Sequence, residues 1–120
     1  MKVNRDFLDY LQDLFGALGT VRVRSMFGGA GVYAGELMFA FLDRDETIYL
    51  RADAETRQAF EAVGSQPFRY RLKTGEEFEI GYWRIPEEAL ESPEDAARWG
   101  RLALDAALRK SRSPGCGRKA

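Results

Sequence analysis

The chain has 120 residues, 45% of them hydrophobic and 31% charged, which suits one domain with a single core and excludes an intrinsically disordered protein. It contains no histidine, and this excludes Ser-His-Asp and Cys-His nucleophile systems as well as metal sites with imidazole ligands. The formal net charge of −1 hides an asymmetry: residues 109–120 hold five basic residues and no acid, so the other 108 residues carry 13 basic against 19 acidic side chains.

The first predicted element is an amphipathic helix that begins after Asn4 and stops at Gly19, which are suitable capping and terminating residues. Its apolar residues recur with the 3.6-residue period of a helix and are Phe7, Leu8, Leu11, Leu14, Phe15 and Leu18. Aspartates interrupt the same segment at positions 6, 9 and 13, so we do not expect a secretory signal. No run approaches the roughly 20 apolar residues of a membrane span, and we expect no membrane association.

Four short strands are predicted next, because apolar residues alternate with polar ones or form short runs between turn residues. These strands cover residues 21–24, 32–33, 37–42 and 47–51. A short helix is expected after Asp53, with Ala59, Phe60 and Val63 facing inward and Gly64 at its end.

The following two strands can be predicted in register as a hairpin. One side of the first strand carries Phe68, Tyr70 and Leu72, and one side of the second carries Phe78, Ile80 and Tyr82. A three-residue loop at 73–75, with Gly75 in the left-handed conformation, puts both sets on the same side. The predicted cross-strand pairs are Tyr70 with Phe78, Phe68 with Ile80, Arg71 with Glu77 and Arg69 with Glu79.

A one-turn segment and a final helix complete the predicted order. Pro86 opens one helical turn at residues 87–90, and Ser92-Pro93 begins a helix that runs to about Lys110. The buried side of this last helix should consist of Ala96, Trp99, Leu102, Ala103, Ala106 and Ala107.

The order of elements predicts an α+β fold with a mainly antiparallel sheet of about five to six strands and helices packed on one face. Written out, the order is α-β-β-β-β-α-β-β-α. The domain should cover residues 1–110, and residues 111–120 should form a flexible basic tail.

The glycine-rich stretch Gly28-Gly29-Ala30-Gly31 is a candidate phosphate-binding loop. It fits neither GxGxxG nor the P-loop pattern, and a strand rather than a helix follows, so a tight turn or bulge with close backbone packing is the better interpretation. A pocket near Gly28-Gly29, Tyr49 and Arg51 is a further hypothesis, for a small-molecule sensor or an unrecognised enzyme.

The acidic and aromatic residues have structural interpretations. Strand alternation sends Glu77 and Glu79 to an exposed face beside arginines, so with Glu76 they form a solvated charge ladder rather than a metal site. Both tryptophans, Trp83 and Trp99, are expected in or beside the core.

Arginines on the predicted strands offer a candidate nucleic-acid surface. Arg22, Arg24, Arg69 and Arg71, with Arg51, could form a basic outer face interleaved with Tyr49 and Tyr70. The net negative charge of the remaining residues disfavours binding to a phosphate backbone, so direct nucleic-acid contact is the alternative hypothesis. The single cysteine, Cys116, cannot form an internal disulfide, and we expect a cytoplasmic protein.

A set of short motifs resembles the TfoX/Sxy N-terminal domain family. The motifs are Arg24-Ser25-Met26-Phe27-Gly28-Gly29-Ala30-Gly31-Val32-Tyr33, Tyr49-Leu50-Arg51, Pro67-Phe68-Arg69-Tyr70 and Tyr82-Trp83-Arg84-Ile85-Pro86, followed by the Trp99 helix. The resemblance covers roughly residues 5–109. We take as family-motif and candidate interaction residues Arg24, Ser25, Met26, Phe27, Gly28, Gly29, Gly31, Tyr49, Arg51, Phe68, Tyr70, Tyr82, Trp83 and Pro86.

The resemblance implies a stand-alone N-terminal domain with the α+β fold of the MmcQ/YjbR group. Longer members of the family are bacterial regulators of natural competence that co-activate transcription and carry a second, helical domain. It implies no catalytic residues and no cofactor. We therefore expect a non-enzymatic regulatory domain that contacts a transcription-related protein, as a monomer or a weak homodimer.

Overall fold

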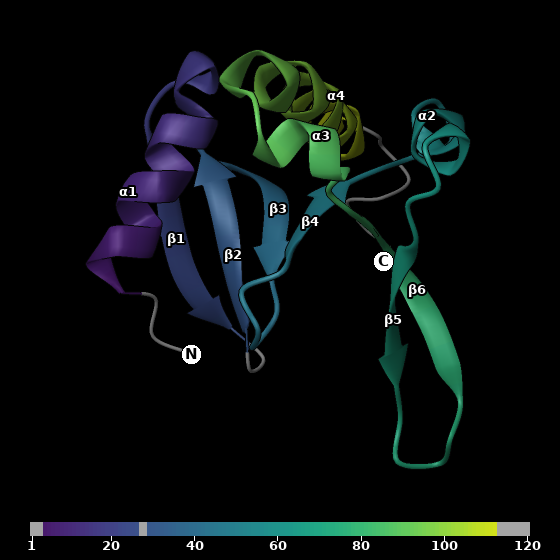
Figure 1. The fold of residues 1–120 in the computed structure, drawn as a ribbon. Helices are drawn as coiled ribbons and strands as arrows, with labels where there is room; N and C mark the ends of the chain where they lie inside the picture. Colours follow the sequence, from purple (N-terminus) through teal and green to yellow (C-terminus); the bar gives the residue numbers. More distant parts are fainter. Residues whose placement is uncertain (1–3, 27–28, 113–120) are drawn as a thin grey trace.

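The structure, a computed structural model, describes residues 4–26 and 29–112, and in these residues it contains one six-stranded sheet and four α-helices (Figure 1). The helices are α1 (Arg5–Leu14), α2 (Arg57–Ala62), α3 (Glu87–Leu90) and α4 (Pro93–Arg112), with a 3-10 turn at Gly16–Leu18. The strands are β1 (Val21–Met26), β2 (Gly29–Ala34), β3 (Leu37–Leu42), β4 (Ile48–Arg51), β5 (Pro67–Arg71) and β6 (Glu77–Arg84). The predicted fold class and element order are confirmed.

All neighbouring strands are antiparallel, in the order β1-β2-β3-β4-β6-β5. The first three connections are hairpins, whereas β5 is reached through α2 and lies at the far edge. β1 and β5 therefore form opposite edges of the sheet, so side chains on these two strands are separated by the other four strands.

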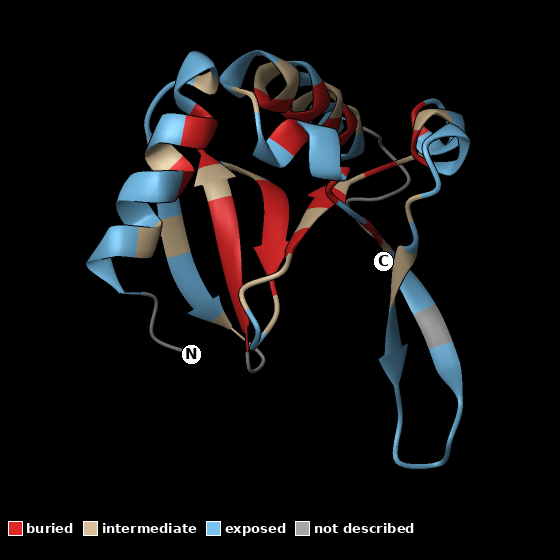
Figure 2. Cartoon of the chain, viewed as in Figure 1, coloured by how far each residue is buried: buried red, intermediate tan, exposed pale blue. Residues whose placement is uncertain are grey.

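The hydrophobic core lies between one face of the sheet and the helices. Each of the four helices buries at least one residue in this core, including Leu11, Phe60, Ala89 and Ala103. Figure 2 shows the buried residues concentrated in the central strands and on the sheet-facing sides of the helices. We call the sheet face that carries this core the inner face and the opposite side the outer face.

Small residues let α4 approach the rest of the core closely. Ala96, Ala103, Ala106 and Ala107 are buried together with Trp99, as predicted, and Leu102 is half-buried. A Cβ atom at Gly100 would lie 2.9 Å from Leu18 Cδ1, so even a methyl group would be crowded there. Trp99 also donates a hydrogen bond of 2.9 Å from Nε1 to Glu88 Oε2, which satisfies its one polar atom.

The β5–β6 hairpin has the predicted register near its tip. Arg71 pairs with Glu77, Tyr70 with Phe78 and Arg69 with Glu79, and Gly75 has a φ of +96° in the turn. The predicted pairing of Phe68 with Ile80 is wrong. Between the Pro67–Trp83 and Arg69–Glu79 pairs, β5 has one residue and β6 has three, so the register shifts.

Several predicted boundaries also differ. α1 ends at Leu14 and a 3-10 turn continues to Leu18, and Thr56 rather than Asp53 occupies the N-cap position of α2. Val63 was predicted to face inward but is 47% exposed, because α2 ends at Ala62. α4 extends to Arg112, two residues beyond the predicted end, and the remaining predicted tail lies outside the described residues.

Candidate interaction surface

The outer face of the sheet carries the residues that the core does not use. Strand alternation and the observed register place one set of residues together on this side. The set consists of Arg22, Arg24, Met26, Tyr33, Met38, Phe41, Tyr49, Arg51, Tyr82 and Arg84. All four helices pack on the inner face, and the last turn of α4 reaches one end of this surface.

Arginines and tyrosines alternate across neighbouring strands of the outer face. Arg22 pairs with Tyr33 and Arg51 with Tyr82 in the ladder. The guanidinium carbons lie 5.8 Å and 5.0 Å from the respective ring centroids, within the range of cation–π attraction. A third pair, Tyr49 with Arg84, has the same register relation. Arg22 and Arg51 are thereby held close to tyrosine rings.

An aromatic cluster occupies the middle of the outer face. The ring of Phe68 lies 5.3 Å from that of Phe41 and 5.0 Å from that of Tyr49, centroid to centroid, and Phe41 also contacts Tyr82 at 6.3 Å. Phe41 and Tyr82 are buried, while Tyr49 and Phe68 are half-buried. Phe68 reaches this cluster from the edge strand β5. The outer face therefore has a small apolar layer of its own, part of which remains accessible.

Two glycines of β2 leave room for neighbouring backbone and side chains to pack closely against this strand. A Cβ atom at Gly29 would be 2.2 Å from the backbone oxygen of Leu42, and one at Gly31 would be 2.8 Å from Met38 Sδ. Both glycines lie within β2, not in a loop before a helix. This supports the interpretation of close backbone packing over a phosphate loop; Phe27 and Gly28 lie outside the described residues.

The arginines of the outer face make no ion pair with a described carboxylate. Among the described residues, the arginines within 4.0 Å of an acid are Arg57, Arg69, Arg71, Arg98 and Arg109, none of which belongs to this face. Two acids lie at its rim: Asp43 accepts a hydrogen bond of 3.5 Å from the Tyr49 hydroxyl, and Glu36 lines a cavity with Arg51. The face is therefore locally positive on a domain whose body is net acidic.

The predicted basic face of five arginines is only partly correct. Arg22, Arg24 and Arg51 share the outer face, but Arg69 and Arg71 are on the edge strand β5, on the side opposite to Phe68. These two form ion pairs with Glu79 and Glu77, as the predicted ladder requires. They do not belong to the outer face.

Two tyrosines of the outer face are withdrawn from water, Tyr82 almost fully and Tyr49 in part. Burial raises the pKa of Tyr82 above its ordinary value, partly opposed by the neighbouring Arg51. Burial likewise raises the pKa of Tyr49, and the Asp43 carboxylate adds to this effect. Both tyrosines are consequently neutral hydrogen-bonding groups, not candidates for a nucleophile near neutral pH.

A cavity of about 350 Å³ opens where the last turn of α4 meets the end of the outer face. It is lined by Glu36, Leu37, Met38, Arg51, Tyr82, Ala107, Lys110 and Ser111. It includes Arg51 from the predicted small-molecule pocket but neither Gly29 nor Tyr49. The cavity thus differs from the one that the sequence suggested.

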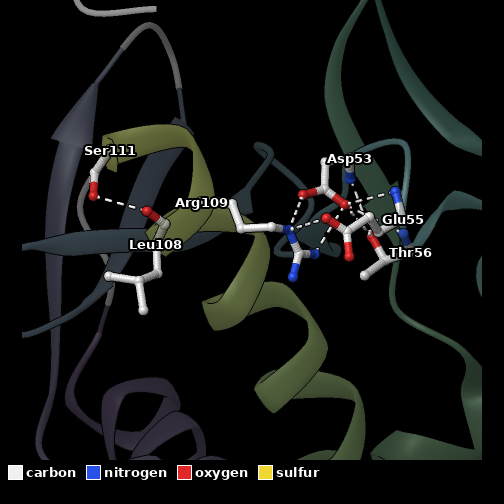
Figure 3. A network of polar contacts seen from close by, with 6 residues as sticks. All are labelled: Asp53, Glu55, Thr56, Leu108, Arg109 and Ser111. Carbon is white, nitrogen blue, oxygen red and sulfur yellow. Dashed lines mark hydrogen bonds and ion pairs between the residues drawn. The ribbon is translucent and has the colours of Figure 1, made fainter. Parts of the chain in front are cut away.

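The strongest polar network lies away from the outer face, at the start of α2 (Figure 3). Arg109 donates from Nε to Asp53 Oδ2 at 2.7 Å and from a terminal nitrogen to Asp53 Oδ1 at 3.0 Å, and Glu55 lies 3.3 Å from Nε. The Arg109 hydrogen bond lowers the pKa of Asp53, and Asp53 also accepts from the backbone N–H groups of Glu55 and Thr56. The network thus joins the last part of α4 to the turn that precedes α2.

Two features are absent from residues 4–26 and 29–112. No group of three or more acids, cysteines or histidines could hold a metal ion. None of the helices is both long and apolar enough to cross a bilayer.

The structure divides the motif residues between the two faces. Tyr49, Arg51, Phe68 and Tyr82 meet on the outer face with Arg24 and Gly31, whereas Trp83 and Pro86 are buried on the core side. Sequence reasoning missed Tyr33, Phe41 and Arg84 as members of the surface. The alternation of Arg84 with the buried Trp83 and Ile85 is a signal that could have identified that residue.

Comparisons with known proteins identify a family and two relatives. The TfoX N-terminal domain family matches residues 13–107. The chain is 28% identical to "Protein Sxy" of Escherichia coli (strain K12) over 99 residues, which cover 82% of this chain and 46% of that protein. It is 31% identical to "DNA transformation protein TfoX1" of Aliivibrio fischeri (strain ATCC 700601 / ES114) over 78 residues, or 62% of this chain and 37% of the relative.

The chain thus spans less than half the length of both relatives. The family match, by contrast, extends from the first helix to the last helix of the domain. The chain belongs to the TfoX N-terminal domain family.

Proposed function

We propose that this domain is a non-enzymatic regulatory module that acts by contacting a transcription-related protein through the outer face of its sheet. One relative is named as a DNA transformation protein, which supports a role in the control of competence. The chain has no histidine, and burial raises the pKa of Tyr49 and Tyr82 on the outer face, so this surface offers little with which to carry out acid–base or nucleophilic chemistry. Such a role fits a cytoplasmic protein.

The observation that carries this proposal is the composition of the outer face. Half-buried aromatic rings lie there beside arginines that form no ion pair within residues 4–26 and 29–112, on the side of the sheet opposite the core. Aromatic and arginine side chains are the types that dominate binding energy at protein interfaces. A surface with this composition is suited to a partner that can both cover the rings and neutralise the cations.

A quantitative pull-down tests the proposal. The wild-type chain is immobilised through its N-terminus and exposed to a lysate of the source organism, with resin that carries no protein as the background control. Captured proteins are identified by mass spectrometry. We expect enrichment of a transcription-related protein that is lost with Arg24→Glu and kept with Arg101→Glu, an exposed arginine on α4. Capture of no such protein under low-salt conditions would count against the proposal.

Direct binding of single-stranded nucleic acid is a second candidate function. It is favoured by the same alternation of arginines and tyrosines, because bases stack on aromatic rings while arginines contact phosphates. Titration of labelled DNA and RNA oligonucleotides at several salt concentrations tests it. Binding that weakens steeply with salt would support this function, and absence of binding at low salt would exclude it.

A further inference from the structure

We propose that the outer face and the projecting tip of the β5–β6 hairpin form one continuous docking surface for an acidic protein segment with one apolar side. We call residues 69–80 of this hairpin the arm. The inference rests on the proposed function and adds the chemistry of the partner. Its basis is the distribution of apolar and charged side chains over the two sides of the arm.

The arm extends away from the body of the domain, as Figures 1 and 2 show. All of its side chains with a described burial are exposed, including Tyr70 at 48%, Leu72 at 37% and Ile80 at 38%. An isolated two-stranded hairpin is at best marginally stable in water. An arm with three large exposed apolar side chains therefore gains stability when a partner covers it.

Phe68 joins the arm to the outer face. Alternate residues of a strand point to the same side, so Tyr70 lies on the side of β5 that carries Phe68. Leu72 follows the end of β5 but continues the ladder, because its backbone N–H donates to Glu76 O at 2.8 Å, and it therefore shares this side. Phe68 itself contacts Phe41 and Tyr49 of the outer face. The apolar side of the arm is thus a continuation of the aromatic cluster.

On the opposite side of the arm, the charged side chains already form ion pairs with one another. Arg69 pairs with Glu79 at 3.3 Å, and Arg71 pairs with Glu77 through both Nε and a terminal nitrogen. These cross-strand pairs cancel one another's charge and are exposed to water. The side continuous with the outer face, by contrast, presents the exposed apolar side chains of Leu72 and Ile80 next to the arginines of that face.

Three kinds of partner can be compared by how well they match the charge and the apolar side chains of this surface. A second copy of the chain seated on it would bring two sets of outer-face arginines together, and like charges across an interface are unfavourable. A nucleic acid would use the arginines, but Leu72 and Ile80 offer it neither stacking nor hydrogen bonds. An acidic segment with an apolar side matches both features, because its carboxylates meet the arginines and its apolar residues cover the arm.

The inference can be tested with a designed peptide. The probe is a fluorescein-labelled peptide in which leucines recur at helical spacing and glutamates fill the other positions, and a matched peptide carries lysine in place of glutamate. Binding to the full chain is followed by fluorescence anisotropy. A labelled oligothymidylate measured in the same way represents nucleic acid.

We expect the glutamate peptide to bind and the lysine peptide not to bind. The double variants Arg22→Glu/Arg24→Glu and Leu72→Ser/Ile80→Ser should each weaken binding by about tenfold or more, because each removes one of the two required features. The matched controls Arg101→Glu and Val63→Ser change exposed residues elsewhere and should alter the affinity by less than about twofold. Circular dichroism spectra checked against wild type would show that each variant is folded.

Three outcomes would overturn the inference. These are equal binding of the lysine peptide, no measurable binding of the glutamate peptide, and oligothymidylate binding that is tighter and lost in the same variants. Failure of the inference is distinguishable from failure of the proposed function. If the lysate partner is captured equally well by wild type and by both double variants, the partner binds elsewhere and only the inference is wrong.

Discussion

Gly29 and Gly31 occupy alternate positions on β2, and each is required for a different reason. The atom that a Cβ at position 29 would meet is a backbone oxygen, which cannot move without distorting the ladder, whereas the Cβ at position 31 would meet flexible methionine ends. We expect Gly29→Ala to lower the free energy of unfolding by about 3 kcal/mol and Gly31→Ala by about 1 kcal/mol. Urea denaturation measures both changes.

The control for these substitutions is Gly16→Ala in the 3-10 turn. A Cβ there would meet nothing nearer than Gln12 Nε2 at 4.0 Å, so the change should be within about 0.5 kcal/mol of zero. Equal effects at positions 29 and 16 would contradict the packing explanation.

Asp53 gives the domain a pH-dependent contribution to stability. The Arg109 hydrogen bond lowers its pKa in the folded state, so the contribution is present above the unfolded pKa of about 3.9 and is lost as the pH falls through the lower, folded value. Both side chains of the pair are about one-third exposed, and solvent screening limits the contribution to about 1 kcal/mol. Asp53→Asn should therefore cost about this much at pH 7 and progressively less below pH 4, as measured by urea denaturation across pH.

Glu61→Gln provides the comparison for this pH dependence. Glu61 pairs with Arg57 on the surface of α2, where both side chains are at least half exposed. Its replacement should change stability by less than about 0.5 kcal/mol at any pH. A pH-independent loss in Asp53→Asn would show that its hydrogen bonds to the backbone, not its charge, matter most.

At the scale of elements, the β5–β6 hairpin depends for its stability mainly on contacts within itself. Its tip is stabilised by its own ladder, and the exposed arm has no core behind it. Backbone amides of residues 69–80 should therefore exchange with deuterium faster by about 100-fold or more than those of β2 and β3. Hydrogen-exchange mass spectrometry measures this difference, and equal protection would show that the arm is covered in solution, for example by self-association.

The same hairpin shows what the sequence could and could not predict. Its register near the turn follows from local alternation and from Gly75, so the pairs of Arg71 with Glu77 and Arg69 with Glu79 were predictable. The two additional residues of β6 and the positive φ of Gly81 were not, because they adapt the strand to β4, which is distant in sequence. For the same reason, alternation could not tell that Phe68 would reach Phe41.

The candidate surface was predictable only to the extent that it depends on single strands. The alternation of Arg22 and Arg24 identified one side of β1, but the placement of β5 at the opposite edge required the strand order. Grouping Arg69 and Arg71 with them therefore failed. The ring contacts of the outer face depend on tertiary packing, which a list of alternating residues does not contain.

At the scale of the whole molecule, folding depends on the body rather than on the arm. No residue between Phe60 and Tyr82 belongs to the buried hydrophobic set of the described residues. Replacing residues 69–80 with a short turn should therefore leave a cooperatively folded domain whose Tm falls by no more than about 5 °C. Differential scanning calorimetry measures the Tm, and loss of the cooperative transition would show that the arm is part of the folding unit.

The two faces of the sheet also differ in the fluorophores they carry. Both tryptophans lie on the helix side, where Phe60 contacts Trp83 and Trp99 at ring distances of 6.1 Å and 5.0 Å. The outer face carries tyrosines but neither tryptophan. Selectively excited indole emission therefore reports on the interior beneath the helices and is blind to direct coverage of the opposite side. A shift in that emission when a partner binds would mean that the strands themselves have moved and transmitted the event through the sheet.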